Sequence, residues 1–134
     1  MKVQIIGYVA AFLLFASCSR EIGDRIDGKW QMQQIEADGK VWNVDTIYYN
    51  FQTSVFMYQI YRPLSDSFSH CYGFKTMETD KQALLELTDY GVVISKFLPQ
   101  TDWETPIRRF IVEEITAKRL ILQSDGKRYI FRRF

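Results

Sequence analysis

From Trp30 onward the chain alternates between hydrophobic and polar residues in short runs, which is the pattern of half-buried β-strands. The first predicted strand covers residues 30–37 and places Trp30 and Met32 on one face. Asp38-Gly39 then predicts a two-residue hairpin turn, because both central residues of a type I′ turn need positive φ. The other predicted strands cover residues 41–51, 53–62, 70–78, 83–88, 107–116, 119–124 and 127–134.

Short strands joined by tight turns predict an all-β fold, an antiparallel up-and-down barrel of about eight strands. A barrel of about eight strands has an interior just wide enough for side chains or for one small ligand. Residues 63–69 are expected to form a loop. Residues 89–106 break the rhythm of the strands, contain Gly91, Pro99 and Pro106, and are expected to hold one short helical turn. A long irregular stretch of this kind is often functional.

The N-terminus has the order of a secretory signal. Lys2 supplies a positive charge, and the fourteen residues Val3 to Ala16 carry none. That run is shorter than the roughly 20 residues needed to span a membrane, and it lacks the polar face of an ordinary surface helix. We therefore expect residues 1–17 to be a signal peptide, in preference to a buried N-terminal helix or strand.

Phe15-Ala16-Ser17-Cys18 resembles the lipobox of bacterial lipoproteins, with Phe15 where the family usually has Leu. The resemblance implies that Cys18 is the lipid attachment site and that residues 18–27 tether the domain of residues 28–134. Anchoring by two or more acyl chains is stable, whereas a single chain holds only marginally. Ser19 follows the cysteine, so the expected address is the outer membrane of a Gram-negative bacterium, on its periplasmic or surface face. A disulfide between Cys18 and Cys71, the only other cysteine, is the disfavoured alternative.

Gly28-Lys29-Trp30 resembles the Gly-X-Trp sequence that opens the first strand of lipocalins and other calycins. In that family the Trp closes one end of the barrel and an Arg from the last strand packs on its ring. The resemblance therefore implies that Gly28 and Trp30 work with Arg132 or Arg133, and the sequence leaves both arginines open.

The whole mature chain also resembles small lipocalin-like lipoproteins of anaerobic Gram-negative bacteria. The residues that carry this likeness are Gly28-Lys29-Trp30, Tyr48-Tyr49-Asn50-Phe51-Gln52, Leu120-Ile121-Leu122-Gln123-Ser124-Asp125 and Phe131-Arg132-Arg133-Phe134. The likeness implies an exported barrel and no particular activity.

The charges and reactive residues exclude several functions. Residues 105–134 contain eight basic and three acidic residues, but their spacing at strand edges and turns indicates a solvated face, so no nucleic-acid partner is expected. His70 and Cys71 are adjacent on a predicted strand and would point to opposite faces, which rules out a catalytic dyad. We expect no enzyme activity, no metal site and no cofactor.

The remaining candidate chemistry is aromatic. Packing of the barrel interior is the default role for these side chains, and a ligand site is the alternative. The candidate ligand-binding residues are Tyr48, Tyr58, Phe97 and Trp103. The apolar residues of the 89–106 loop would form a plug in the barrel end, a lid over a ligand or a partner-binding patch. The sequence therefore supports two hypotheses: a protein that binds a small apolar or amphipathic ligand, or a filled barrel that contacts or inhibits an envelope protein.

Overall fold

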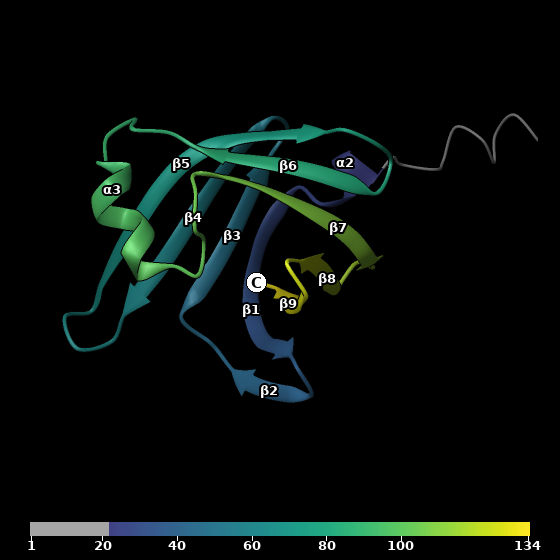
Figure 1. Ribbon diagram of the computed structural model, residues 1–134, viewed down its shortest axis with the longest axis horizontal. Coiled ribbons are helices and arrows are strands. Elements are labelled where there is room, and N and C mark those ends of the chain that lie inside the picture. The colour runs from purple at the N-terminus through teal and green to yellow at the C-terminus, as the bar shows by residue number, and fades with distance from the viewer. Residues whose placement is uncertain (1–21) are drawn as a thin grey trace, which may run out of the picture.

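The computed structural model describes residues 22–134, which form an antiparallel β-barrel (Figure 1). Nine strands follow a short helix α2 (Ile22–Arg25), and two short helical segments, α3 (Ile94–Phe97) and η1 (Leu98–Gln100), lie between the sixth and seventh strands. The strands are β1 (Gly28–Ala37), β2 (Lys40–Asn43), β3 (Ile47–Gln52), β4 (Val55–Arg62), β5 (Ser67–Met77), β6 (Gln82–Leu87), β7 (Ile107–Ile115), β8 (Arg119–Ser124) and β9 (Lys127–Arg133).

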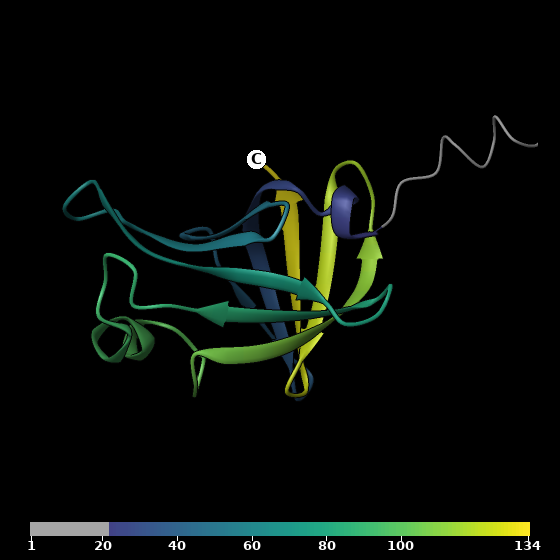
Figure 2. The same ribbon diagram turned by 90° about the horizontal axis from the view of Figure 1, so that it is seen from above.

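Eight of these strands close into a ring. Each strand from β3 to β8 pairs with the next, and β1 pairs with both β3 and β9, so the ring has no open edge. Figure 2 shows the yellow C-terminal strands crossing the teal and green strands at a steep angle, so the barrel is strongly twisted. The expected eight-stranded antiparallel barrel is thus confirmed.

The prediction of one strand over residues 41–51 is wrong, because the chain divides there into β2 and β3. β2 pairs only with Gln34 to Ala37 of β1, whereas β3 pairs with Gly28 to Gln31. Between these two sections β1 carries an irregularity at Met32–Gln34, where its register with β9 shifts. The N–H of Val44 donates to the carbonyl of Gln33 at 2.9 Å, so the chain changes partner beside this bulge. β2 therefore forms a hairpin with the C-terminal part of β1 and is not one of the eight strands of the ring.

The tight turns follow the predicted chemistry. Asp38 and Gly39 have φ of 52° and 72°, and Asp125 and Gly126 have φ of 52° and 75°, as two-residue hairpin turns require. The expected loop over 63–69 is shorter than predicted, since β5 begins at Ser67. The Tyr61 hydroxyl donates to the side chain of Asp66 at 2.7 Å and stabilises this compact turn.

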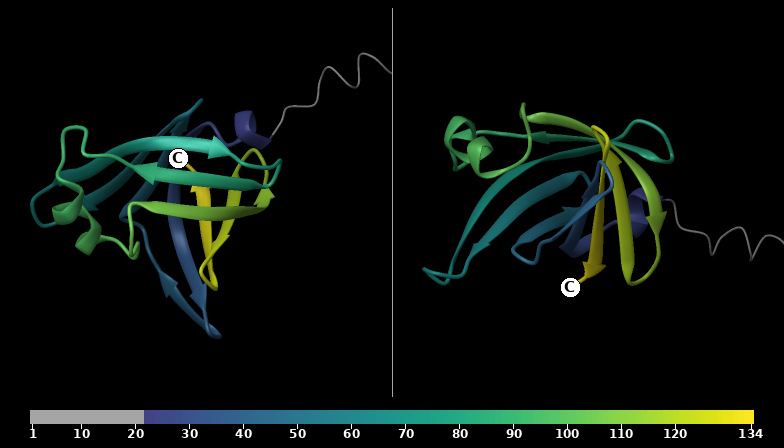
Figure 3. Two further views of the ribbon diagram at one scale, coloured as in Figure 1. Left: turned by 45° about the horizontal axis from the view of Figure 1, so that its top comes forward. Right: turned by 60° about the horizontal axis from the view of Figure 1, so that its bottom comes forward.

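The two ends of the barrel are closed by different kinds of segment. We call the end that carries α2 and the turns at residues 53–54, 78–81 and 116–118 the N-terminal end. The opposite end, the loop end, carries the turns at 38–39, 63–66 and 125–126 and the long connection 88–106. In both views of Figure 3, α3 lies at the opposite side of the molecule from α2.

Trp30 and Arg133 close the N-terminal end. The Trp30 ring is fully buried, its Nε1–H donates to the carbonyl of Ile26 at 2.7 Å, and the Arg133 guanidinium lies 3.9 Å from the ring centroid. The same guanidinium donates to the carbonyls of Asp27 (2.6 Å), Arg25 (3.3 Å) and Ala117 (3.2 Å). Arg132, by contrast, is exposed and donates to the Gln31 side chain at 2.7 Å.

Gly28 is the residue that lets Arg133 reach this position. Its φ is +130°, and a Cβ there would lie 2.3 Å from Arg133 Nη1. Any other residue would therefore strain the backbone and displace the guanidinium. Gly28, Trp30 and Arg133 form one closing unit, while Arg132 lies outside it.

Replacing each arginine in turn tests whether the closing unit includes Arg133 and excludes Arg132. Arg133→Ala should lower the free energy of unfolding by about 2–4 kcal/mol, because it removes a cation over a buried indole and several charge-assisted hydrogen bonds. Trp30→Ala should cost about 3–5 kcal/mol. Arg132→Ala, the matched control, should cost less than about 1 kcal/mol. Urea titration followed by circular dichroism measures all three, and equal losses for the two arginine variants would contradict the assignment.

Candidate functional site

The interior of the barrel is filled by aromatic side chains. Tyr49 is fully buried at its centre, and five other aromatic rings have their centroids 4.9–6.4 Å from the centroid of the Tyr49 ring. Those rings belong to Phe51, Phe56, Tyr58, Phe110 and Phe131. Strand alternation puts them on the inner face, since each is separated by an even number of positions from another inward residue of its strand.

Three of the four candidate ligand-binding residues meet in this interior. Tyr58 comes from β4, while Phe97 and Trp103 come from the 88–106 connection. The Phe97 ring packs edge-on against Tyr58 at 5.5 Å between centroids. The Trp103 ring stacks on Phe56 at 6.0 Å with an interplanar angle of 5°, and its Nε1–H donates to the Tyr49 hydroxyl at 3.1 Å.

Phe97 and Trp103 therefore plug the loop end from within. Only 1% of Phe97 and 4% of Trp103 is exposed, although both lie in the irregular connection between β6 and β7. Of the three roles expected for this loop, the geometry is that of a plug, because both rings occupy the interior and pack directly on strand residues.

Tyr48 lies elsewhere, on the outer wall of the barrel, so its grouping with the other three candidates is corrected. It is the neighbour of the inward-facing Tyr49 on β3 and points the opposite way. Its ring packs against Phe134 at 5.2 Å and against Lys29 Nζ at 4.7 Å, and its hydroxyl accepts a hydrogen bond from Gln31 at 3.1 Å. These contacts bury the ring without bringing it to the interior.

Beside the plug lies a cluster of polar groups that the sequence interpretation missed. Arg108 was grouped with solvated basic residues, but it is only 7% exposed. Its Nη2 donates to the Tyr129 hydroxyl at 2.7 Å, and its Nε donates to Ser124 Oγ at 3.0 Å. The available signal was its phase on β7, where it alternates in step with the inward residues Phe110 and Val112.

Asp102, the residue before Trp103, completes this cluster. Its carboxylate accepts a hydrogen bond from the Tyr129 hydroxyl and pairs with Arg108 Nη1 and Lys127 Nζ, each at 3.3 Å. A second carboxylate, that of the largely exposed Asp125, lies 3.2 Å from Arg108 Nε. Two cations of the strands thus meet two anions, one from the loop and one from a hairpin turn.

These contacts keep the cluster in one protonation state. Burial, followed by the hydrogen bond to Asp102, raises the pKa of Tyr129 well above its ordinary value, so the phenol stays protonated and donates. Burial by itself would lower the pKa of Arg108, but the neighbouring Tyr129 and Asp102 outweigh it and the pKa is raised. Arg108 is therefore a permanent buried cation that needs an anionic partner.

Within residues 22–134 the Tyr58 hydroxyl has no partner in hydrogen-bonding geometry, although the Tyr49 hydroxyl is near enough to lower its pKa slightly. It is buried in the aromatic interior, and its pKa is raised by burial and by the charge of Asp102. A buried hydroxyl without a partner costs free energy, and most such groups in folded proteins are paired. The Tyr58 hydroxyl is therefore a buried polar group that remains available to bind a polar atom in the interior.

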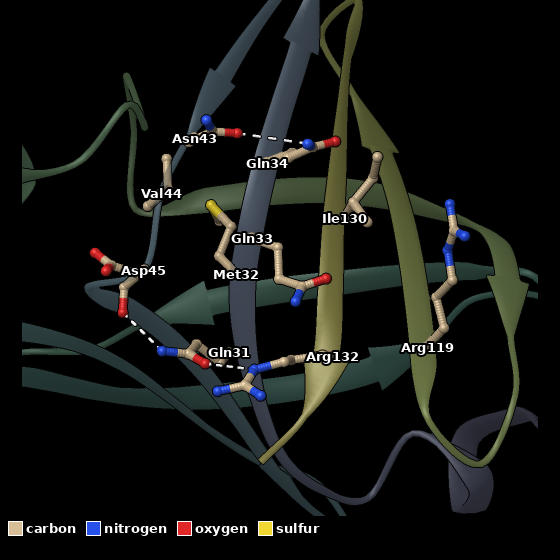
Figure 4. A pocket seen from close by; sticks show the side chains of 10 residues that line it. All are labelled: Gln31, Met32, Gln33, Gln34, Asn43, Val44, Asp45, Arg119, Ile130 and Arg132. Carbon is tan, nitrogen blue, oxygen red and sulfur yellow. Dashed lines mark hydrogen bonds between the residues drawn. The ribbon is translucent and has the colours of Figure 1, made fainter.

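Several hollows lie on the outer surface of the part of the chain that the structure describes, and two of them have volumes of about 740 and 780 Å³. The one of about 740 Å³ follows the bulge of β1 and is lined by the amide side chains of Gln31, Gln33, Gln34 and Asn43 and by Arg119 and Arg132 (Figure 4). The other, of about 780 Å³, is mainly apolar and is lined by Val55, Tyr72, Phe74 and Tyr90 together with Gly73, Thr88 and Asp89. Neither hollow reaches the aromatic interior residues Tyr49 and Tyr58.

The structure does not bring His70 and Cys71 together as a catalytic pair. His70 is exposed on the outer face of β5, whereas Cys71 is a free cysteine that points into the core, so the two side chains do not meet. Within residues 22–134 no group of three or more His, Cys, Asp and Glu side chains is arranged to hold a metal ion. No helix in the described part of the chain has the length and apolar character to cross a bilayer. Cys18, the expected lipid attachment site, lies outside the described residues.

The free Tyr58 hydroxyl makes a test of the interior. Tyr58→Phe should leave stability unchanged or raise the free energy of unfolding by up to about 3 kcal/mol, since it removes an unpaired buried polar group. Tyr129→Phe, the matched control, removes a bonded hydroxyl and should lower that free energy by about 1–3 kcal/mol. Thermal unfolding of both variants decides, and a loss of more than about 1 kcal/mol for Tyr58→Phe would contradict the description of its hydroxyl.

Comparison with known proteins places this geometry in a family. No curated protein matches the chain. A lipocalin-like protein from Bacteroides uniformis has a similar crystal structure, with 25% sequence identity, a TM-score of 0.73, and coverage of 82% of this chain and 99% of that one. An uncharacterised protein from Bacteroides eggerthii is 28% identical with a TM-score of 0.67 and coverage of 81% and 98%. The family model for the lipocalin-like domain matches residues 13–134, so the chain belongs to the lipocalin-like family.

Proposed function

We propose that this protein binds a small amphipathic molecule in the loop-end half of its barrel, in the space that Phe97 and Trp103 occupy in the closed form. The observation that carries the proposal is the origin of these two rings. Both are buried among the strands, yet both belong to an irregular connection and not to the sheet. Membership of the lipocalin-like family supports ligand binding by analogy.

Besides the packing of its Phe97 and Trp103 rings, the plug makes few hydrogen bonds and ion pairs outside its own segment. The Trp103 Nε1–H donates to Tyr49, Gln100 accepts a hydrogen bond from the exposed Arg62, and Asp102 contacts Arg108, Lys127 and Tyr129. Its other hydrogen bonds are local, such as the bond from the N–H of Ile94 to Asp89 and from the N–H of Thr101 to Leu98. The segment can therefore open without breaking the ladder of the barrel.

A ligand would replace the apolar rings of the plug with an apolar body of its own. Phe and Trp side chains each bury about 150–250 Å² of surface, so an apolar body of similar size would recover the area lost on opening. The unpaired Tyr58 hydroxyl and the polar groups beside Trp103 would then meet the ligand. A small body with one polar end fits this combination of surfaces.

The second candidate function is contact with another envelope protein, and the filled interior favours it. The outward side chains of β4 and β5 also include no Asp, Glu, Lys or Arg; they are Val55, Met57, Gln59, Tyr61, Phe68, His70, Tyr72, Phe74 and Thr76. An uncharged wall with exposed aromatic rings is typical of a contact surface.

Truncation of the plug distinguishes the two functions. If a ligand replaces the plug, Phe97→Ala should bind apolar and amphipathic probes, such as decanoic acid and 1-decanol, at least about tenfold more tightly than the unaltered protein, because the variant removes an internal competitor. Trp42→Ala, which alters the exposed indole of β2, is the control and should change nothing. Calorimetric titration measures the affinities, with circular dichroism as the check of folding. Folded variants that bind no probe would reject the ligand site and favour protein contact.

We also propose that the domain is held at the outer membrane by a lipid on Cys18. The lipobox-like sequence supports this, as does the short distance from Cys18 to α2 along the chain. The N-terminal end of the barrel would then face the membrane side, and the plug would face away from the anchor.

Cysteine replacement tests the anchor. Cys18→Ala should leave the protein without lipid and move it from the membrane fraction to the soluble fraction, because stable attachment needs the acyl chains. Cys71→Ala, which alters a buried cysteine, should leave attachment unchanged. Mass spectrometry of the mature N-terminus gives the readout, and a mature chain that starts at an unmodified Ser19 would refute lipidation.

A further inference from the structure

We infer that the ligand is an amphipathic carboxylate and that Asp102 holds the place of its carboxylate in the closed barrel. This inference rests on the proposed function, since it names the chemical class of the molecule that replaces the plug. Asp102 and Trp103 are consecutive, and together they present an anionic group and an apolar ring. An amphipathic acid presents the same two groups.

The two groups occupy separate parts of one site. The Trp103 ring lies inside the barrel against Phe56 and Tyr58, while the Asp102 carboxylate lies at the rim against Arg108 and Tyr129. The Arg108 guanidinium connects them, because it also lies 6.0 Å from the centroid of the Trp103 ring. The apolar body and the head group of a ligand would follow the same path.

The groups that bind the carboxylate are fixed, whereas the carboxylate itself is on the connection. Arg108 belongs to β7, and Lys127 and Tyr129 belong to β9. Arg108 is held further by Ser124, whose Oγ accepts its Nε–H at 3.0 Å and in turn donates to the carbonyl of Arg109 at 2.6 Å. The guanidinium therefore stays in position when the connection leaves.

Charge then selects the ligand. With Asp102 withdrawn, the one ion pair left to Arg108 within residues 22–134 is with Asp125, whose side chain is 76% exposed, and Lys127 loses its pair with Asp102. A guanidinium whose side chain is 6% exposed then loses its ion pair with Asp102, whose side chain is 27% exposed, and this loss is unfavourable. A carboxylate restores both the charge and the hydrogen bond from Tyr129, and guanidinium geometry suits a carboxylate well. A neutral hydroxyl head group can accept the hydrogen bond but does not restore the charge, and a cationic head group restores neither.

Tyr58 supports the presence of a ligand by an independent observation. Its hydroxyl is buried in the interior without a hydrogen-bond partner among residues 22–134, and its ring centroid lies 5.9 Å from that of Trp103. When the Trp103 ring leaves, this hydroxyl borders the vacated space and can donate to a polar atom on the body of the ligand.

Binding of three probes with the same chain tests the inference: decanoic acid, 1-decanol and decylamine, each below its micelle concentration at pH 7. The full-length mature protein without its lipid should bind the acid at least about tenfold more tightly than the alcohol, and the amine least. Asp102→Asn should raise the affinity for the acid by about tenfold or more, because it removes the competing anion. Asp125→Asn, the matched control, also alters a carboxylate beside Arg108 but on a turn of the sheet, and should change that affinity less than about threefold.

The outcomes separate this inference from the function on which it rests. Equal binding of acid and alcohol, or weaker binding of the acid by Asp102→Asn, would overturn the carboxylate assignment and leave the ligand site standing. Failure of every probe with the unaltered protein, with Asp102→Asn and with Phe97→Ala would overturn both. Increased acid affinity in Asp125→Asn equal to that in Asp102→Asn would show a general charge effect and would also overturn the role of Asp102.

Discussion

The seating of the Trp103 ring among Phe56, Tyr58 and Tyr49 is the interaction on which the loop end of this barrel depends. An eight-stranded barrel can be filled by its own side chains or can hold one small molecule. Here a ring from the connection between β6 and β7 completes the filling. Removal of that ring would leave a buried donor at Tyr58, a buried cation at Arg108 and an apolar space between them.

The two ends of the barrel use similar chemistry for different purposes. At each end an arginine lies against an indole and donates to nearby oxygens: Arg133 with Trp30, and Arg108 with Trp103. At the N-terminal end both partners belong to strands, so the closure is as stable as the sheet. At the loop end Arg108 belongs to a strand but Trp103 does not. Closure there depends on a segment with a local hydrogen-bond pattern, and such segments open at lower free energy than strands.

Much of the barrel could be predicted from the sequence, because strand alternation and turn chemistry are local properties. The two Asp-Gly turns and the closed eight-stranded ring follow from them. The division of residues 41–51 could not be predicted, because it depends on the bulge in β1 that β2 and β3 flank. Arg108 alternates in step with Phe110 and Val112, which indicates an inward position, but its charge favoured the prediction of a surface position. Tyr48 was grouped with the interior residues because it is aromatic, but its neighbour Tyr49 is the residue of β3 that points into the interior.

Hydrogen exchange of two indole N–H groups tests directly whether the plug opens separately from the barrel. Trp30 and Trp103 are both buried and both donate a hydrogen bond, to Ile26 and to Tyr49 respectively. The exchange rates are measured by nuclear magnetic resonance in low concentrations of denaturant. The Trp103 N–H should exchange faster than global unfolding allows, and its rate should depend little on denaturant. The Trp30 N–H should exchange only through global unfolding. Exchange of both groups at the rate of global unfolding would contradict a separable plug.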